Sequence, residues 1–257
     1  MNRLRQLNEL GIDTVWRLRG PSVAVPGLAA AGAGMPAGAD RVAPGAAAGA
    51  GAGAVAVLGE AALRGVTVPS GWDALEQGVA ACNACGLCRS RNRAVPGRGD
   101  RSAALMIVGD APDAEEDAEG EPFAGQSGRL LDNMLGAIGL ARGAGAYVTN
   151  IVKCRPPAQR SPQADEFVQC AAWLQAQVDL VSPRLILVLG RSAAQGILGG
   201  EASVPLLRGQ MHRWRDRPVL VSYHPTQLLH TPRDKAKAWE DLLRVRHELS
   251  RQPSDRR

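Results

Sequence analysis

Short apolar runs alternate with amphipathic stretches along the last two thirds of the chain. Two stretches, Gln126–Leu140 and Gln163–Leu180, place their apolar residues at helical spacing. The apolar runs between and around them have the length and continuity of buried strands; they are Ala104–Gly109, Ala146–Ile151, Arg184–Gly190 and Pro218–Tyr223. Alternating strands and helices favour right-handed crossovers and a parallel sheet. We therefore predict an α/β fold, a three-layer α/β/α sandwich with a central four-stranded, mostly parallel sheet.

The chain ahead of the first strand has a different character. Residues 1–20 carry a short amphipathic pattern, and residues 21–69 are rich in Ala, Gly and Pro without periodicity. Such a composition is typical of a flexible linker. We expect the folded domain to span residues 70–248 and a polar tail to follow over residues 249–257.

No targeting or membrane signal is evident. Charged residues occupy the first positions, where a signal peptide would need an apolar run. The uncharged window Val42–Gly59 consists largely of Ala and Gly and contains Pro44, so its transfer into a membrane is poorly favoured. We expect a monomeric, cytoplasmic protein without membrane contact.

The composition excludes some classes of protein but does not identify a ligand. An apolar fraction of 45% is enough for a substantial core. The 30 glycines have no three-residue period, which excludes collagen, and five cysteines are too few for a small disulfide scaffold. The net charge of +5 permits nucleic-acid binding but does not establish it.

The cysteine spacing indicates a metal site. Cys82 and Cys85 form a C-x2-C pair, and Cys154 and Cys170 form a distant second pair. Four thiolates suit zinc or an iron–sulfur cluster, and spacing alone does not choose between them. Cys88 is left over, and the alternative for each cysteine is a buried apolar thiol.

Polar residues gather after the first predicted strand. Seven acidic residues fall within Asp110–Glu121, and Phe123 follows between Pro122 and Ala124. A solvated charged loop is the ordinary interpretation of such a run. Its position at a strand's carboxyl end, where α/β sheets bind ligands, favours a functional site instead. The helix start Gln126–Gly128 offers free N–H groups to a phosphate.

Two other predicted strands end in polar groups as well. Asn150 has both a donor and an acceptor, as reading a base edge requires, although a capping Asn is the common alternative. His224 is suited to donate to a developing negative charge, although a lone His is more often structural. Leu228 and Leu229 are either core residues or, on an exposed loop, a wedge into stacked bases.

Five motifs occur together in one order: CNACGL, GDAPDAEEDAEGEPFAGQSG, TNIVKCRPP, LILVLGRSAAQ and HPTQLL. Over about Trp72–Leu243 the sequence resembles the family 4 uracil-DNA glycosylases, the iron–sulfur branch of the uracil-DNA glycosylase superfamily.

The resemblance implies a set of site residues. The metal ligands of a [4Fe–4S] cluster would be Cys82, Cys85, Cys154 and Cys170, with zinc as the alternative metal. The catalytic residues would be Asp110, Glu116 and His224, and the substrate-binding residues would be Ala111, Phe123, Asn150, Leu228 and Leu229. Phe123 would stack on an extruded uracil, Asn150 would read its edge, and His224 would lie against a carbonyl of the leaving base.

The sequence also departs from the family pattern. GEAPG becomes GDAPD, so Asp110 is one methylene shorter than the usual Glu, and Asp113 replaces a Gly. Asp113 is expected to bring charge close to the ligand. PFVG becomes PFAG at Ala124, and HPAYLLRNP becomes HPTQLLHTP, which puts His230 where an Arg would face phosphate.

The activity implied is hydrolysis of the N-glycosidic bond of deoxyuridine in single- or double-stranded DNA, a step of base excision repair that releases uracil and leaves an abasic site. The alternative is a catalytically weak glycosylase-like protein that binds DNA or the replisome. Residues 6–21 faintly resemble the start of the psi subunit of bacterial DNA polymerase III, which would imply a replication partner for the N-terminal segment; a simple amphipathic helix is the favoured interpretation of these sixteen residues.

Overall fold

Four parallel strands form the centre of the sheet in the computed structural model, which describes residues 71–200 and 203–251. They are β2 (Leu105–Gly109), β3 (Ala146–Asn150), β4 (Leu185–Leu189) and β6 (Arg217–Ser222), and they pair in the order β3-β2-β4-β6. These are the four predicted strands, each end correct to within one residue. Every residue of β2, β3 and β4 is buried, because parallel strands are covered by helices on both faces.

Two short antiparallel strands extend the sheet beyond the predicted four. Strand β1 (Arg98–Gly99) pairs with β3, and β5 (His212–Trp214) pairs with β6. The prediction of four strands was therefore too low, since the sheet has six. Strands of two and three residues with charged or exposed positions leave no apolar run in the sequence, and such short edges are typical of sheet borders.

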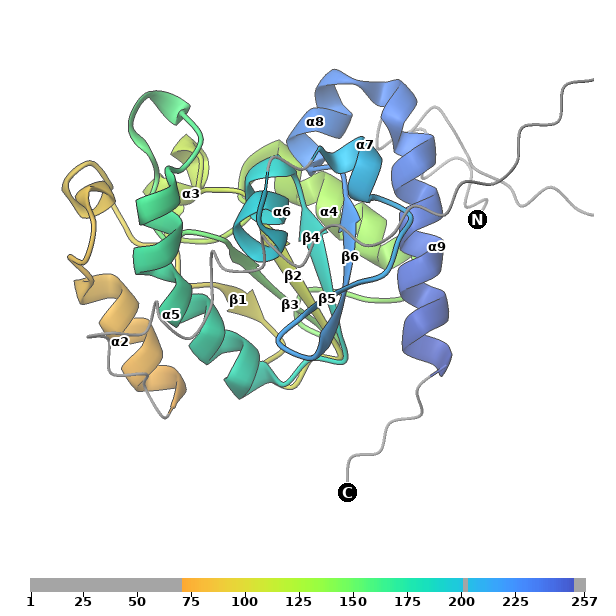
Figure 1. Ribbon diagram of the computed structural model, residues 1–257, viewed down its shortest axis with the longest axis horizontal. Coiled ribbons are helices and arrows are strands. Elements are labelled where there is room, and N and C mark those ends of the chain that lie inside the picture. Colours follow the sequence, from red (N-terminus) through yellow and green to blue (C-terminus); the bar gives the residue numbers. More distant parts are fainter. Residues whose placement is uncertain (1–70, 201–202, 252–257) are drawn as a thin grey trace, which may run out of the picture. The chain divides into compact units, whose positions relative to one another are not determined.

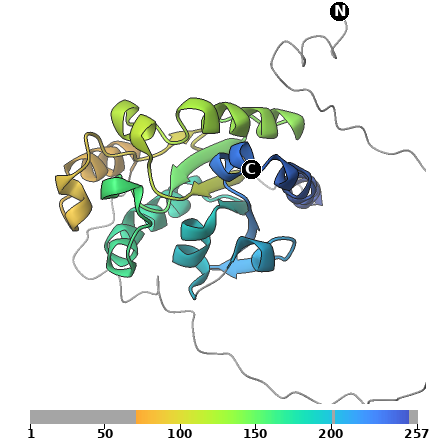
Figure 2. The same ribbon diagram turned by 90° about the horizontal axis from the view of Figure 1, so that it is seen from above.

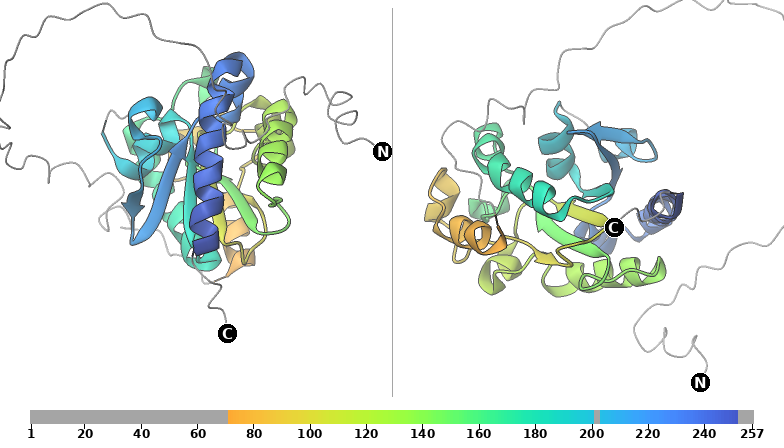
Figure 3. Two further views of the ribbon diagram at one scale, coloured as in Figure 1. Left: turned by 90° about the vertical axis from the view of Figure 1, so that its right-hand side faces the viewer. Right: turned by 90° about the horizontal axis from the view of Figure 1, so that it is seen from below.

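Helices cover both faces of the sheet. Figures 2 and 3 show α4 (Gly125–Ala137) and α9 (Lys235–Arg251) on one side and α5 (Ala164–Val181) and α6 (Arg191–Leu198) on the other. Helix α2 (Trp72–Ala81) packs against α5 (Figure 1). The predicted three-layer α/β/α sandwich is confirmed. The remaining elements are α3 (Ala114–Glu119), α7 (Val204–Leu207), α8 (Pro225–His230) and the 3-10 turns Gly86–Arg89, Pro157–Gln159 and Pro232–Asp234.

Helix α5 illustrates why these sequences form these elements. A capping box joins Gln163 and Glu166 at its start, which satisfies backbone N–H groups that have no partner within the helix. Its predicted face is buried through Phe167, Ala171, Leu174 and Val178. The helix ends at Val181, its C-cap residue Ser182 has a left-handed conformation, and Pro183, which cannot continue a helix, follows.

The described residues belong to one compact unit, Ala50–Arg257. The predicted N-terminal segment 1–20 and linker 21–69 lie outside them. Helix α9 continues to Arg251, which lies within the expected tail, and the domain limits stay a prediction. Across residues 71–200 and 203–251, none of the helices has the length and apolar character that crossing a membrane requires.

The sheet order fixes where a ligand would bind. The chain leaves β2 toward β3 on one side and leaves β4 toward β6 on the other. In α/β sheets, ligands bind outside the carboxyl ends of two adjacent strands whose following connections run to opposite sides in this way. The residues that follow β2 and β4 therefore occupy the switch point of the fold.

Candidate active site

The carboxyl ends of the four central strands bring most of the predicted site residues to one edge of the sheet. Gly109 pairs with Asn150 across β2 and β3, and Leu189 pairs with Ser222 across β4 and β6. Asp110 directly follows β2, and His224 follows β6 by two residues. The site is thus assembled by strand register from segments that lie far apart in the sequence.

The Asp110 carboxylate faces the start of helix α6. Its Oδ1 accepts a hydrogen bond of 2.8 Å from the Ala193 backbone N–H, and the Ser192 N–H donates to the same carboxylate. Gly190 has a φ of +104°, and a Cβ on it would lie 2.3 Å from Asp110 Oδ2, so only glycine fits here. Burial raises the pKa of Asp110 to about 6, against the lowering by these N–H groups. Asp110 is therefore mainly ionised at neutral pH and is held against the positive end of a helix.

Glu116 is buried and accepts hydrogen bonds from both sides of the acidic loop. Its Oε2 accepts from the Asp113 backbone N–H at 2.8 Å, and its Oε1 accepts from the Phe123 backbone N–H and from Asn150 Nδ2, the latter at 3.0 Å. Burial raises the pKa of Glu116 to about 7, although these three donors favour the charged form. With each oxygen accepting from at least one N–H, the carboxylate acts as a bridge between the loop, Phe123 and Asn150.

Asn150 is oriented by this bridge. The amide is 1% exposed, and its Nδ2 must face Glu116, because a carboxylate only accepts hydrogen bonds. Its Oδ1 lies toward Gly109, where a Cβ would be 2.7 Å away. The second N–H of Nδ2 and the Oδ1 acceptor therefore point in fixed directions. Such a pair can bind an acceptor and a donor on the edge of a planar base.

Phe123 lies beside Asn150 in an unusual backbone conformation. Its φ is +53°, and its ring is buried against Gly109, where a Cβ would lie 2.5 Å from Cζ. The ring stacks on the His224 imidazole with a centroid distance of 5.1 Å and an interplanar angle of 23°. A left-handed, non-glycine residue that the surrounding structure holds in place is typical of ligand sites.

His224 is a neutral imidazole at physiological pH. Burial lowers its pKa to about 4. Its Nδ1 accepts from the Thr226 backbone N–H at 3.3 Å, so the proton of the neutral ring is on Nε2. A neutral Nε2–H donor is suited to a developing anion.

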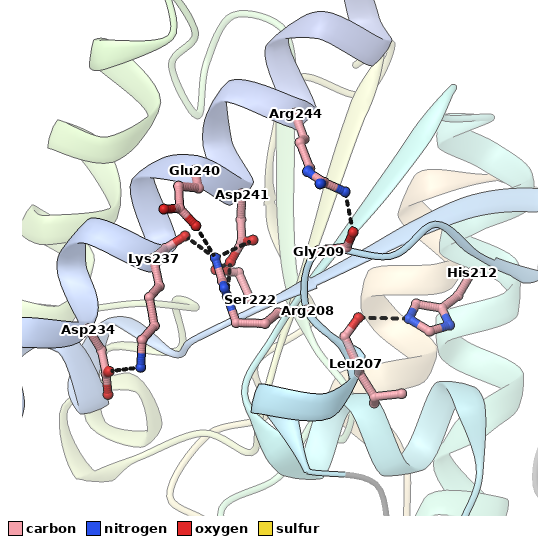
Figure 4. Close-up of polar contacts among 10 residues, drawn as sticks. All are labelled: Leu207, Arg208, Gly209, His212, Ser222, Asp234, Lys237, Glu240, Asp241 and Arg244. Carbon is pink, nitrogen blue, oxygen red and sulfur yellow. Dashed lines mark hydrogen bonds and ion pairs between the residues drawn. The ribbon is translucent and has the colours of Figure 1, made fainter. Parts of the chain in front are cut away.

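A polar network fixes the strand end that carries His224 (Figure 4). Ser222 donates to the buried Asp241 carboxylate at 2.7 Å, and Arg208 donates to the same carboxylate at 2.9 and 3.1 Å. Burial raises the pKa of Asp241 even so. The network anchors β6 to α9 two residues before the imidazole.

The two leucines of α8 separate into different environments. Leu228 is 1% exposed and belongs to the core, which favours the first of its two interpretations, whereas Leu229 is 37% exposed. Of the pair, Leu229 is the residue available to a ligand. Ala111 is half-buried and packs against the core beside Asp110.

The four predicted metal ligands frame one pocket together with Trp173. Its lining includes Cys82, Cys85, Cys154 and Cys170. Within the described parts of the chain, no three His, Cys, Asp or Glu side chains converge closely enough to hold a single metal ion. The thiols therefore surround a space instead of meeting at a point.

Nitrogen donors point at three of these sulfurs. Arg91 Nη1 lies 2.9 Å from Cys154 Sγ, Trp173 Nε1 lies 3.3 Å from Cys82 Sγ, and the Lys153 backbone N–H lies 3.3 Å from Cys170 Sγ. Donors of this kind favour thiolates over thiols. Burial raises the pKa of Cys154 and that of Cys170, the latter to about 12, so a bound cation would be needed to ionise them.

Comparison with known proteins defines the family. Residues 96–243 match the model of the uracil DNA glycosylase superfamily. The chain is 38% identical to the type-4 uracil-DNA glycosylase of Sulfurisphaera tokodaii, over 67% of this chain and 82% of that protein. The type-4 enzymes of Saccharolobus solfataricus and Archaeoglobus fulgidus are 35% and 34% identical, over 70% and 67% of this chain and 88% and 90% of their own lengths.

The chain belongs to the type-4 uracil-DNA glycosylases. The family identified from the motifs is thus confirmed. The structure also accounts for one departure from the family pattern. The Asp113 carboxylate accepts from the Glu115 and Glu116 N–H groups at 2.9 Å and caps α3. His230 is exposed near the end of α8.

Several residues that contact the candidate site could not be predicted from the sequence of this type-4 glycosylase. Gly190 and the start of α6 hold Asp110, and the motif LILVLGRSAAQ marked the segment without suggesting that contact. Arg91 donates to Cys154, and the only indication of this in the sequence was that Arg91 lies close to the C-x2-C pair. Arg142 contacts the Phe123 backbone, and no pattern in the sequence indicated it. The roles of the predicted site residues themselves stay predictions.

Proposed function

We propose that this type-4 glycosylase hydrolyses the N-glycosidic bond of deoxyuridine in DNA, releasing uracil and leaving an abasic site. The observation that carries the proposal is the Asn150 amide, fixed by Glu116 beside the Phe123 ring at the carboxyl ends of β2 and β3. Uracil presents an N3–H donor and an O4 acceptor on one edge. Asn150 Oδ1 and the second N–H of Nδ2 complement that pair, whereas cytosine presents the opposite pattern.

The base must leave the stack before its sugar carbon can be reached, which costs a few kcal/mol. Stacking on Phe123 and the exposed Leu229 side chain would offset that cost. Asp110, with its negative charge held against α6, would orient the attacking water and stabilise positive charge on the sugar. His224 would donate from Nε2 to the departing uracil anion, and each such electrostatic contact is worth about 3 kcal/mol.

The four thiols around the pocket beside Trp173 are a donor set of the kind that binds a polynuclear iron–sulfur centre. Cys82, Cys85, Cys154 and Cys170 would hold a [4Fe–4S] cluster, which would supply a structural link between the segment after α2 and the loop after β3. Their arrangement around a pocket, with N–H donors at three sulfurs, supports a cluster over a single zinc ion. A broad visible absorption band, together with four iron atoms and no zinc for each chain, is the expected result for freshly purified protein.

The proposed partner is uracil-containing DNA, single- or double-stranded. Incubation with such oligonucleotides, followed by cleavage at abasic sites, tests the activity. We expect product with wild type and a loss of at least about a hundredfold with Asn150→Ala, since both base contacts disappear. Binding without product would favour the catalytically weak DNA-binding alternative, and undiminished cleavage by Asn150→Ala would refute the proposed reading of the base.

A further inference from the structure

The backbone of Phe123 is held by a residue outside the recognised motifs. Arg142 lies in the turn between α4 and β3, and its Nη1 donates to the carbonyl oxygens of Pro122 at 3.1 Å and of Phe123 at 3.0 Å. On the other side, the Phe123 N–H donates to Glu116. Both polar groups of this left-handed residue are thus engaged, one by a buried carboxylate and one by a guanidinium.

Arg142 is itself fixed by an ion pair. Its Nε and Nη2 donate to the two carboxylate oxygens of Asp132 on α4, at 2.6 and 2.7 Å. This two-point geometry sets the plane of the guanidinium as well as its position. The remaining nitrogen, Nη1, is then directed at the Pro122 and Phe123 carbonyls. The Arg142 carbonyl accepts from the Asp100 N–H at 2.9 Å, which anchors the turn to the strand β1 side of the sheet.

The first turn of α4 is shaped to allow this contact. A Cβ on Gly128 would lie 1.7 Å from the Phe123 carbonyl oxygen and 2.9 Å from Arg142 Nη2. Any larger residue would push the Phe123 backbone out of reach of Arg142. Gly128 therefore serves a close backbone approach between the first turn of α4 and Phe123.

We propose that Arg142, held by Asp132, is a positioning residue that keeps Phe123 in its left-handed conformation and so holds the aromatic platform for the base. A phenylalanine with positive φ is strained and persists only where the surroundings fix it. Without the guanidinium, the Phe123 carbonyl loses its donor and the ring loses its fixed place against His224. The inference rests on the proposed function, in which that ring stacks on uracil.

The two phenylalanines of the chain provide a direct measurement. Full-length protein labelled with 3-fluorophenylalanine should give fluorine signals from Phe123 and from Phe167 only. The meta position is chosen because one meta carbon of Phe123 points away from Gly109, whereas Cζ and Cε2 face it. Phe167, buried in α5, serves as the internal reference, and Phe167→Leu assigns the two signals.

In Arg142→Gln we expect the Phe123 signal to shift or broaden while the Phe167 signal stays in place. Uracil excision, measured as kcat/KM, should fall about ten- to a hundredfold through loss of the two carbonyl contacts. Arg142→Lys should recover part of the activity, because an ammonium still donates to the carbonyls but lacks the planar fork. Asp132→Asn should shift the Phe123 fluorine signal less than Arg142→Gln does. Arg101→Gln, which breaks a pair of 2.7 Å with Glu76, is the matched control and should change neither readout.

An unchanged Phe123 signal with unchanged kcat/KM in Arg142→Gln would overturn the inference. A shift of both signals together with a lower melting temperature would also overturn it, since the role would then be general to the fold. Failure of the proposed function looks different. Wild-type protein would not excise uracil, while the selective movement of the Phe123 signal in Arg142→Gln would still support the contact with Arg142.

Discussion

Replacing Glu116 by glutamine should lower uracil excision without lowering the thermal stability of the protein. The carboxylate accepts three hydrogen bonds, from Asp113, Phe123 and Asn150. A glutamine has one acceptor oxygen, so its amide nitrogen must face at least one of these donors. If its oxygen keeps Phe123 and Asn150, the capping box of α3 is lost, and the bond to Asn150 changes from charge-assisted to neutral.

The expected loss of activity follows from that change. Charge-assisted hydrogen bonds contribute about 1.5–3 kcal/mol and neutral ones about 0.5–1.5 kcal/mol. The difference is about 1–1.5 kcal/mol, or roughly tenfold in kcat/KM. Because the introduced glutamine can also turn its amide around, the Asn150 amide is no longer held in one orientation. Cytosine excision relative to uracil excision should therefore increase.

The thermal stability of Glu116→Gln should not fall with its activity. Burial raises the pKa of Glu116 to about 7, a bias of roughly 3 kcal/mol against the ionised form relative to water. Glu116→Gln removes that buried charge, and this gain offsets the lost capping box, which is worth about 1 kcal/mol. At pH 8 we expect the melting temperature of Glu116→Gln to equal or exceed that of wild type while excision falls.

The assay is single-turnover excision from matched uracil and cytosine oligonucleotides, with thermal unfolding followed by circular dichroism. Glu119→Gln, on the exposed side of α3, is the control and should leave both unchanged. Excision by Glu116→Gln within twofold of wild type would refute the argument. So would a loss of activity that is explained entirely by a lower melting temperature.

Three further outcomes follow from the geometry. Gly190→Ala should abolish most uracil excision and destabilise the fold by about 1–3 kcal/mol, because the added Cβ would displace Asp110 and the φ of this position is positive. The control is Gly136→Ala, which has open space around it and should change neither excision nor thermal unfolding. The kcat/KM profile should rise through about pH 7 as Glu116 ionises. Because the pKa of Glu116 is higher in the folded protein than in the unfolded chain, the stability that this group contributes is complete below about pH 4.5 and is lost as the pH rises through 7. The melting temperature should therefore fall over the pH range in which kcat/KM rises. Arg91→Gln should speed the loss of visible absorbance in chelator, because Arg91 donates to a proposed cluster ligand.

The central strands could be predicted because burial on both faces leaves a continuous apolar run in the sequence. Strand β5, His212–Trp214, could not, since its pattern of one buried residue after two less buried ones resembles any loop. Its position is set by pairing with β6, a contact between chain segments that periodicity does not encode. The same reasoning applies to Arg98–Gly99 beside β3.

The site was partly predictable for a related reason. Asn150 and Phe123 stand in motifs at strand ends, so residue type and position together pointed to them. The bond from Asn150 to Glu116 spans 34 residues, and that from Arg142 to Phe123 spans 19. Such partners become visible only when register and helix packing bring them together.

The carboxylates of Asp110 and Glu116 both have raised pKa values but lie in different surroundings. Asp110 lies at the fold's switch point, is partly exposed, and accepts hydrogen bonds from backbone N–H groups of α6 beside Gly190, which has no side chain. Glu116 has both oxygens engaged by the loop, the platform and the amide. A buried carboxylate whose two oxygens both already accept hydrogen bonds is poorly placed to bind a water molecule, whereas a partly exposed carboxylate can still accept from one. Under the proposed function, Asp110 would therefore be the acid that orients the attacking water, and Glu116 would orient the Asn150 amide that reads the base.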